Sequence, residues 1–206
     1  MGFYTDQVVP RIIDRACGGA EMRPLRDRTC EGLAGEIVEL GFGSGRNVGS
    51  YPDAITLVHA IEPSMVGRSL GADRIAGSAV PIEFSGLHGE SLPLADASCD
   101  GALCTFTLCT IGDVDAAMQE LLRVLRPGAP FHFLEHGSAP DPKVRRWQHR
   151  LDPLQQRLAD GCHLTRDPVE IVRRNGFRID SFESTYVRGP KPWVYFTFGR
   201  ATAPQR

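Results

Sequence analysis

From residue 35 onward, short apolar segments with strand character alternate with segments of helical periodicity, and this alternation limits the possible folds more than any other feature. Strands are predicted at residues 36–40, 55–61, 81–87, 101–106 and 131–134. Helices are predicted after Pro63-Ser64 and at residues 114–125, 143–158 and 168–175. Strands that alternate with helices form a mostly parallel sheet covered on both faces. The sequence therefore predicts a doubly wound, Rossmann-like α/β fold.

The two ends of the chain depart from this pattern. Residues 177–187 and 193–199 are predicted strands with no helix between them, so we expect them to pair antiparallel. The helix at 143–158 is expected to break at Pro153, because proline has no N–H for the helical hydrogen bond. Apolar residues between Val8 and Cys17 predict a short amphipathic helix, followed by a polar, arginine-rich connector.

Composition narrows the class of protein. The chain has 206 residues, which fits one domain, and its formal net charge of −2 gives no reason to expect nucleic acid as a partner. No stretch approaches the roughly 20 apolar residues that span a bilayer, and residues 1–17 lack an apolar export core, so a cytoplasmic protein is expected. The six cysteines show no CxxC pair and no standard zinc spacing, which predicts buried thiols and no metal.

The first predicted strand ends in a glycine turn preceded by a carboxylate. Gly41, Gly43 and Gly45 allow the backbone to turn sharply and approach a ligand closely. A dinucleotide fingerprint needs glycine or alanine three residues after Gly43, and Arg46 stands there. Glu39 would also repel a pyrophosphate and attract a cation. The turn therefore disfavours a nicotinamide-dependent oxidoreductase.

Further candidates follow the other strands, where open α/β sheets bind their ligands. Glu62, followed by Pro63, lies about 20 residues after the glycine turn, the usual offset of a carboxylate that binds ribose hydroxyls. Its alternative role is to favour a helix entry through the helix dipole. Gly89 and Glu90 are placed to contact a base through backbone groups, or they belong to a plain connecting loop. Together with the turn, Glu62 indicates a nucleoside site.

Several of these segments resemble the class I S-adenosylmethionine (SAM)-dependent methyltransferases. The resemblance covers residues 35–134 and rests on residues 39–45, Glu62, residues 89–93 and residues 123–128. It implies a seven-stranded sheet with an antiparallel last strand, and SAM as the cofactor. The ammonium and sulfonium groups of SAM suit the negative charge of Glu39, and Thr105 and Phe106 are expected to touch its methionine part.

A narrower resemblance links the chain to the methyltransferase-like thiol S-methyltransferases. It rests on residues 103–109, on Glu135-His136 and on the unusual string at residues 160–166. Phospholipid and quinone methyltransferases share much of the same framework, and acceptor specificity changes easily on one fold. The resemblance therefore implies a small-molecule acceptor, with a thiol as the first candidate.

Two histidines are candidate catalytic residues. His136 follows the fifth strand and is a candidate general base, or a structural histidine bonded to a neighbouring loop. His163 lies in the unusual string and is either a proton acceptor and pocket wall or part of a loop in which Thr165 caps the next helix. A base is less necessary for a thiol, because its ordinary pKa of ~8.5 leaves part of it ionised near neutral pH.

These expectations divide the single domain 1–206 into three parts. Residues 1–34 form a helical lid, residues 35–136 a SAM-binding core, and residues 137–206 the acceptor-side helices and the final strand pair. Two alternatives stay open: a methyltransferase for a phospholipid, quinone or other lipid-like acceptor, and a SAM-binding regulator without catalysis. Basic residues within 143–157 leave a peripheral membrane contact open, and the sequence leaves the oligomeric state undetermined.

Overall fold

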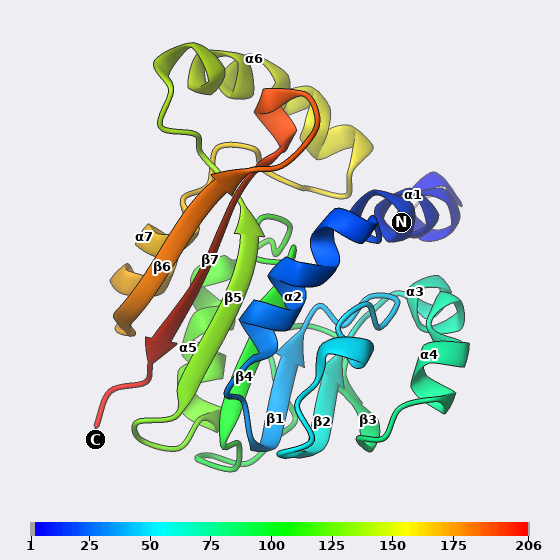
Figure 1. Ribbon diagram of the computed structural model, residues 1–206, viewed down its shortest axis with the longest axis vertical. Helices are drawn as coiled ribbons and strands as arrows, with labels where there is room; N and C mark the ends of the chain where they lie inside the picture. Colours follow the sequence, from blue (N-terminus) through cyan, green and yellow to red (C-terminus); the bar gives the residue numbers. More distant parts are fainter. Residues whose placement is uncertain (1–2, 206) are drawn as a thin grey trace.

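A computed structural model describes residues 3–205 and contains a single seven-stranded sheet (Figure 1). The strands are β1 (Gly35–Leu40), β2 (Ile55–Ile61), β3 (Ile82–Gly86), β4 (Gly101–Thr105), β5 (Pro130–His136), β6 (Arg178–Tyr186) and β7 (Tyr195–Thr202). Their order is β3-β2-β1-β4-β5-β7-β6, and β7 pairs antiparallel with both β5 and β6. The predicted fold class, including the inserted antiparallel strand, is confirmed.

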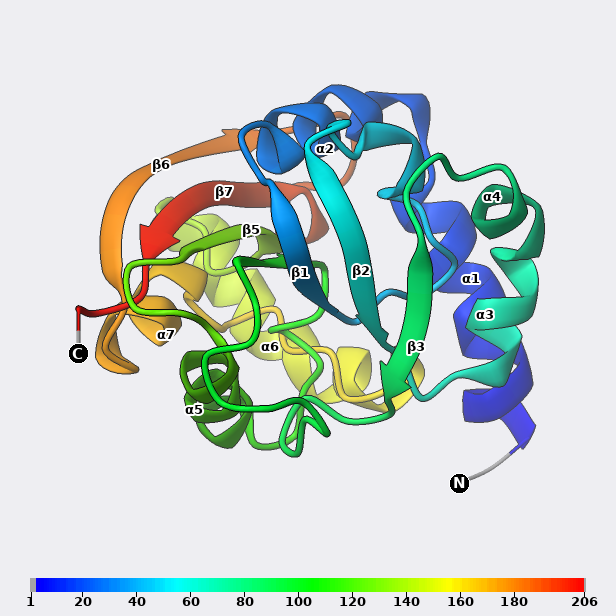
Figure 2. The same ribbon diagram turned by 90° about the horizontal axis from the view of Figure 1, so that it is seen from below.

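Helices cover both faces of the sheet (Figures 1 and 2). The helical segments are the π-helical turn Tyr4–Val8, α1 (Val9–Cys17), the 3₁₀ turn Ala20–Met22, α2 (Arg23–Cys30), the 3₁₀ turn Val48–Ser50, α3 (Met65–Leu70), α4 (Ala72–Ala76), α5 (Val114–Val124), α6 (Pro142–Leu158), α7 (Pro168–Arg174) and the 3₁₀ turn Lys191–Trp193. Figure 2 shows α2 on one face and α5 and α7 on the other, while α1 lies beside α3.

The alternation of β1 explains how one strand supplies two cores. Ile37 packs in the cluster on the α2 face, whereas Val38 and Leu40 pack in the larger cluster with Met118 and Leu121 of α5. Successive side chains of a strand point to opposite faces, so a strand buried on both sides must be apolar at nearly every position. Both faces of the sheet are therefore covered, so a site can form only at the ends of the strands.

Two of the helix predictions differ from the structure. The connector after α1 contains a helix, α2, which the sequence pattern did not predict. Only Arg26, Thr29 and Cys30 of this helix are buried, so it has no apolar stripe that would mark it in the sequence. Helix α6 continues through Pro153, and the buried Asp152 beside it fixes its second half by accepting from Leu164 N at 2.6 Å. The loss of one helical hydrogen bond is thus tolerated within a packed helix.

The boundaries near the C-terminal strands also shift. Lys191–Trp193 form a 3₁₀ turn, so β7 begins at Tyr195 rather than at residue 193. The residue that caps α7 is Asp167, whose side chain accepts from Val169 N at 2.9 Å, and not Thr165. In residues 3–205, no helix is both long and apolar enough to cross a lipid bilayer.

Candidate functional site

A cavity of about 380 Å³ opens at the carboxyl edge of the sheet, where β1, β2 and β4 end. Its walls are the glycine turn after β1, the loop after β2, residues 87–90 after β3, residues 105–107 after β4, and one side of α1. The volume is typical of small-molecule sites, which span roughly 300–1,000 Å³. Of the predicted cofactor-binding residues, the wall includes Gly41, Gly43, Glu62, Pro63, Gly89, Glu90, Thr105 and Phe106.

The glycine turn and Glu62 are joined by hydrogen bonds. One carboxylate oxygen of Glu62 accepts from Gly43 N at 2.7 Å, and the other accepts from Ser64 N at 2.6 Å. Gly41 has a φ of 68°, and a Cβ there would collide with the Thr107 side chain. Burial raises the pKa of Glu62 above its ordinary value. Each oxygen keeps a free lone pair, so the carboxylate is able to accept bonds from a ligand as well.

Glu39 lies behind the wall rather than on it. The residue is 0% exposed and does not line the cavity, and neither does Gly45. Its carboxylate accepts from Asn47 Nδ2 at 2.8 Å and from the Tyr51 hydroxyl. Burial raises the pKa of Glu39 to about 7. When ionised, the carboxylate therefore acts on the cavity through Asn47 and the groups bonded to it, and not through direct contact.

Arg26 of α2 is a wall residue that the sequence did not single out. Its Nη1 donates to Asn47 Oδ1 at 2.5 Å and to Thr105 Oγ1 at 3.0 Å, and its guanidinium lies 5.0 Å from the centre of the Phe106 ring. Phe106 has a φ of 57°, a strained backbone for a bulky residue and a feature that clusters at functional sites. Arg26 gives this end of the cavity a fixed positive charge beside the carbonyl end of β4.

Helix α1 forms one side of the cavity and is fastened by Asp14. The Asp14 carboxylate pairs with Arg46 at 2.7 Å and with Arg74 at 3.6 Å. Burial by itself would raise its pKa, but hydrogen bonds from Arg46 and Ser44 lower it. Because Arg46 follows the glycine turn, this ion pair joins α1 directly to the cofactor side of the cavity.

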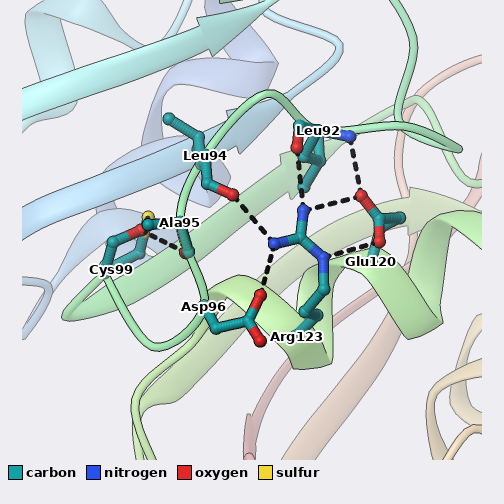
Figure 3. A network of polar contacts seen from close by, with 8 residues as sticks. Leu92, Leu94, Ala95, Asp96, Cys99, Glu120 and Arg123 are labelled. Atoms are coloured by element: carbon teal, nitrogen blue, oxygen red, sulfur yellow. Dashed lines mark hydrogen bonds and ion pairs between the residues drawn. The ribbon is translucent and has the colours of Figure 1, made fainter.

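The loop after β3 is held on α5 by Arg123 (Figure 3). Arg123 donates to the backbone oxygens of Leu92 and Leu94 at 2.8 Å each, and to Asp96 Oδ1 at 2.7 Å. Glu120 completes the arrangement by bonding both Arg123 and Leu92 N. This network positions the segment that continues from Gly89 and Glu90. The family-like motif at 123–128 thus has a supporting role that its sequence did not reveal.

The predicted catalytic histidines lie outside the cavity wall. His136 is 8% exposed, and its Nε2 is 3.5 Å from Cys162 Sγ. The side chain of His163 is 30% exposed and lies 3.5 Å from Asp152. Glu135, next to His136, accepts from Thr107 N at 2.8 Å and Leu108 N at 3.0 Å, which shapes the loop after β4. Catalysis by either histidine stays a prediction.

Comparison with known proteins gives a consistent family. Residues 38–133 match the family described as "Methyltransferase domain". The chain is 32% identical over 177 residues to human thiol S-methyltransferase TMT1B, covering 82% of this chain and 69% of that protein. It is 32% identical over 159 residues to the ubiquinone/menaquinone biosynthesis C-methyltransferase UbiE of Methylobacterium nodulans, covering 74% and 60%.

Among solved structures, the [4+2]-cyclase SpnF has a TM-score of 0.70 with 21% identity, covering 90% of this chain and 82% of that one. At that identity the likeness shows the fold alone.

The chain belongs to the class I SAM-dependent methyltransferase family. Within this family it resembles the thiol S-methyltransferases, of which it spans 59% to 69% of the length. The resemblance inferred from the sequence is therefore confirmed.

Proposed function

We propose that the protein is a SAM-dependent methyltransferase that acts on a small-molecule acceptor, with a thiol as the first candidate. The observation that carries this proposal is the pair of bonds from Gly43 N and Ser64 N to Glu62 at the rim of the 380 Å³ cavity. These bonds fix a carboxylate with free lone pairs beside a close-approach glycine turn. Such a carboxylate suits the two hydroxyls of a ribose.

The rest of the cofactor is assigned by charge and position. Gly89 and Glu90, after β3, are proposed to hold the adenine, and Thr105 and Phe106 the methionine part. The fixed charge of Arg26 suits the methionine carboxylate. The buried Glu39 favours the ammonium and sulfonium groups over a distance.

The proposed reaction transfers a methyl group from the SAM sulfonium to an acceptor sulfur. The acceptor loses its proton, the new C–S bond forms as the sulfonium–methyl bond breaks, and S-adenosylhomocysteine leaves. A thiolate and a sulfonium thus become two neutral sulfides, which a site of low dielectric favours. The chain's contribution is alignment of the two reactants and exclusion of water by α1.

We keep His136 and His163 as proposed acceptors of the thiol proton. Neither histidine lines the cavity, so a water or a shift of residues 160–166 must connect it to the acceptor. Asp160, at the start of that string, lines the cavity and marks the side from which the acceptor would enter.

The test uses labelled SAM and a panel of alkyl thiols, aryl thiols, matched alcohols, catechols, quinols and phospholipids. We expect label in the thiol products, with the Glu62→Gln variant inactive and still folded. Turnover of quinol or phospholipid but of no thiol would replace the thiol by a lipid-like acceptor. SAM binding without transfer to any acceptor would favour a regulator, and absence of SAM binding would refute the proposal.

A quinone-type acceptor is the second candidate because of the similarity to UbiE. Two exposed apolar side chains of the cavity wall suit such an acceptor: Ile13 is 38% and Leu87 is 52% exposed. The same panel separates the two candidates. We also propose a cytoplasmic location, since all six cysteines are free thiols, as is usual in a reducing compartment.

A further inference from the structure

Three potential metal ligands meet behind the cavity in a cluster formed by Cys109, His136 and Cys162. Cys162 Sγ is 3.5 Å from Cys109 Sγ and 3.5 Å from His136 Nε2, and all three ligand atoms lie within 4.8 Å of one another. The side chains are 4%, 8% and 9% exposed for Cys109, His136 and Cys162. We propose that this cluster binds one soft divalent metal ion of the zinc type.

The distances suit a tetrahedral ion. Zn–S bonds of about 2.3 Å and Zn–N bonds of about 2.0–2.1 Å place neighbouring ligand atoms roughly 3.5–3.8 Å apart. The two contacts of Cys162 already have this length. Cys109 Sγ and His136 Nε2 lie within 4.8 Å of each other, so closing the site needs them to approach by about 1 Å. Three protein ligands leave the fourth position for a water or an exogenous ligand.

The charges of the ion and its ligands cancel, which suits a buried site. Each cysteine loses its proton on binding, so one divalent ion and two thiols give a neutral centre and two released protons. A neutral centre avoids the high cost of burying an isolated charge. Imidazole nitrogen and thiolate sulfur are together the preferred ligands of zinc, and the set contains no carboxylate that would favour magnesium or calcium.

The loops that carry the ligands are held together before any ion binds. His163 N donates to Cys109 O at 2.8 Å, which joins the chain beside Cys162 to the loop after β4. Arg166 Nη1 donates to Leu108 O at 2.5 Å and to Ile111 O at 2.8 Å, fixing the same loop from the other side. His136 ends β5 and is fixed by the sheet. The cluster is therefore preorganised.

The site also gives Cys162 and Arg166, two residues of the string at 160–166, a role that the proposed function does not assign to them. Cys162 and Arg166 both belong to this string, and both act on the loop after β4. Thr110 and Asp160, each within two residues of a ligand, line the cavity. A bound ion would hold the acceptor side of the cavity rigid. It would also occupy His136, so that His163, which is not one of the three ligands, would remain the proposed acceptor of the thiol proton in the metal-bound protein.

The experiment measures metal content and ligand type on the full chain. Protein purified with zinc present and then gel-filtered is expected to keep one zinc per chain by mass spectrometry. Replacement by cobalt(II) should give the thiolate-to-cobalt charge-transfer band and the visible bands of a tetrahedral ion. Cys162→Ala and His136→Gln should bind at least ~10-fold more weakly, since even loss of an outer-shell partner costs that much.

Cys99→Ala is the matched control, because Cys99 is also a fully buried free thiol but lies just before β4, at the opposite edge of the sheet. It should bind zinc as the wild type does. Wild-type protein that holds no stoichiometric zinc while its thiols are reduced would overturn the proposal. So would unchanged binding in Cys162→Ala, or a Cys109–Cys162 disulfide in fresh protein without metal.

If the ligand variants do not fold, X-ray absorption on the zinc-bound wild type decides the question. Two sulfur ligands and one imidazole support the site, whereas a shell of oxygen or nitrogen atoms alone refutes it. SAM binding is measured on the same samples, so failure of the metal site is distinguishable from failure of the proposed methyltransferase.

Discussion

The two sides of the cavity are held in place by different kinds of contact. On the cofactor side, Glu62 is fixed by backbone N–H groups of Gly43 and Ser64, which lie close to strand ends. On the acceptor side, the loop at Cys109 is fixed by His163 and Arg166, which are more than 50 residues away in the sequence. On the first side, backbone groups at the strand ends therefore orient the ligand-binding carboxylate directly. The second side depends on a distant segment, which contacts the loop through the backbone N–H of His163 and the side chain of Arg166, so substitutions in that segment are able to reshape it.

The largest effect is expected for Glu62→Ala. The variant loses the acceptor for the ribose hydroxyls, and each bond to a charged group is worth roughly 1.5–3 kcal/mol. Affinity for S-adenosylhomocysteine, measured by calorimetry, should fall about 100-fold. The variant also leaves Gly43 N and Ser64 N without their acceptor, so unlike a purely ligand-binding residue it should lose some stability.

Glu83→Ala is the control for that prediction, because Glu83 is an exposed carboxylate on β3. The affinity of Glu83→Ala for S-adenosylhomocysteine should stay at the wild-type level. If Glu62→Ala binds S-adenosylhomocysteine as tightly as the wild type does, Glu62 does not bind the ribose.

The next effect is a dependence of stability on pH through Glu39. Its pKa is about 7 in the folded state, above its ordinary value of 4.5. The folded state thus binds the proton more tightly, so this contribution to stability is present below pH 4.5 and is lost as the pH rises through 7. Between pH 5 and pH 8, the free energy of unfolding should fall by about 2 kcal/mol relative to Glu39→Gln.

Chemical denaturation of both proteins at several pH values measures this difference, in which the other titrating groups cancel. A flat difference would mean that Arg26 and Asn47 keep Glu39 ionised at all these values. Saturating SAM should reduce the slope in the wild type, because the positive charges of SAM favour the ionised carboxylate.

A smaller effect is expected where α1 joins the cofactor side of the cavity. Asp14→Asn removes the ion pairs with Arg46 and Arg74, which are partly buried. Partly exposed pairs are worth up to about 1 kcal/mol. Steady-state kinetics should show KM for the acceptor raised about threefold and kcat little changed. Asp73→Asn, on α4, is the control. An equal change of KM in both variants would show that the attachment of α1 has no specific effect on acceptor binding.

The smallest effect is expected for Arg123→Met. The substitution releases the loop at residues 92–96 from α5, but the side chain is 31% exposed, so the cost to stability should stay within about 1 kcal/mol. SAM affinity should fall about twofold because the adenine segment is less ordered. Arg126→Met, which loses the pair with Asp100, should lose similar stability and keep its SAM affinity.

Local patterns explain what the sequence determined. The alternation of strands and helices, the glycine turn and the carboxylate at Glu62 depend on residues close together in the chain, so they were visible before the structure. The alternation of strands and helices predicted the mostly parallel sheet, and the absence of a helix between β6 and β7 predicted that these two strands pair antiparallel. Glycine spacing and Glu39 likewise separated this turn from a pyrophosphate-binding one.

Tertiary packing decided the rest. Arg26 belongs to a helix with few buried residues, and only folding turns its guanidinium toward Thr105 and Phe106. Cys109 and Cys162 are 53 positions apart, so no spacing rule could join them with His136. Side chains that meet through separate loops leave no periodic trace in a sequence, because their positions follow from how the strands are ordered in the sheet.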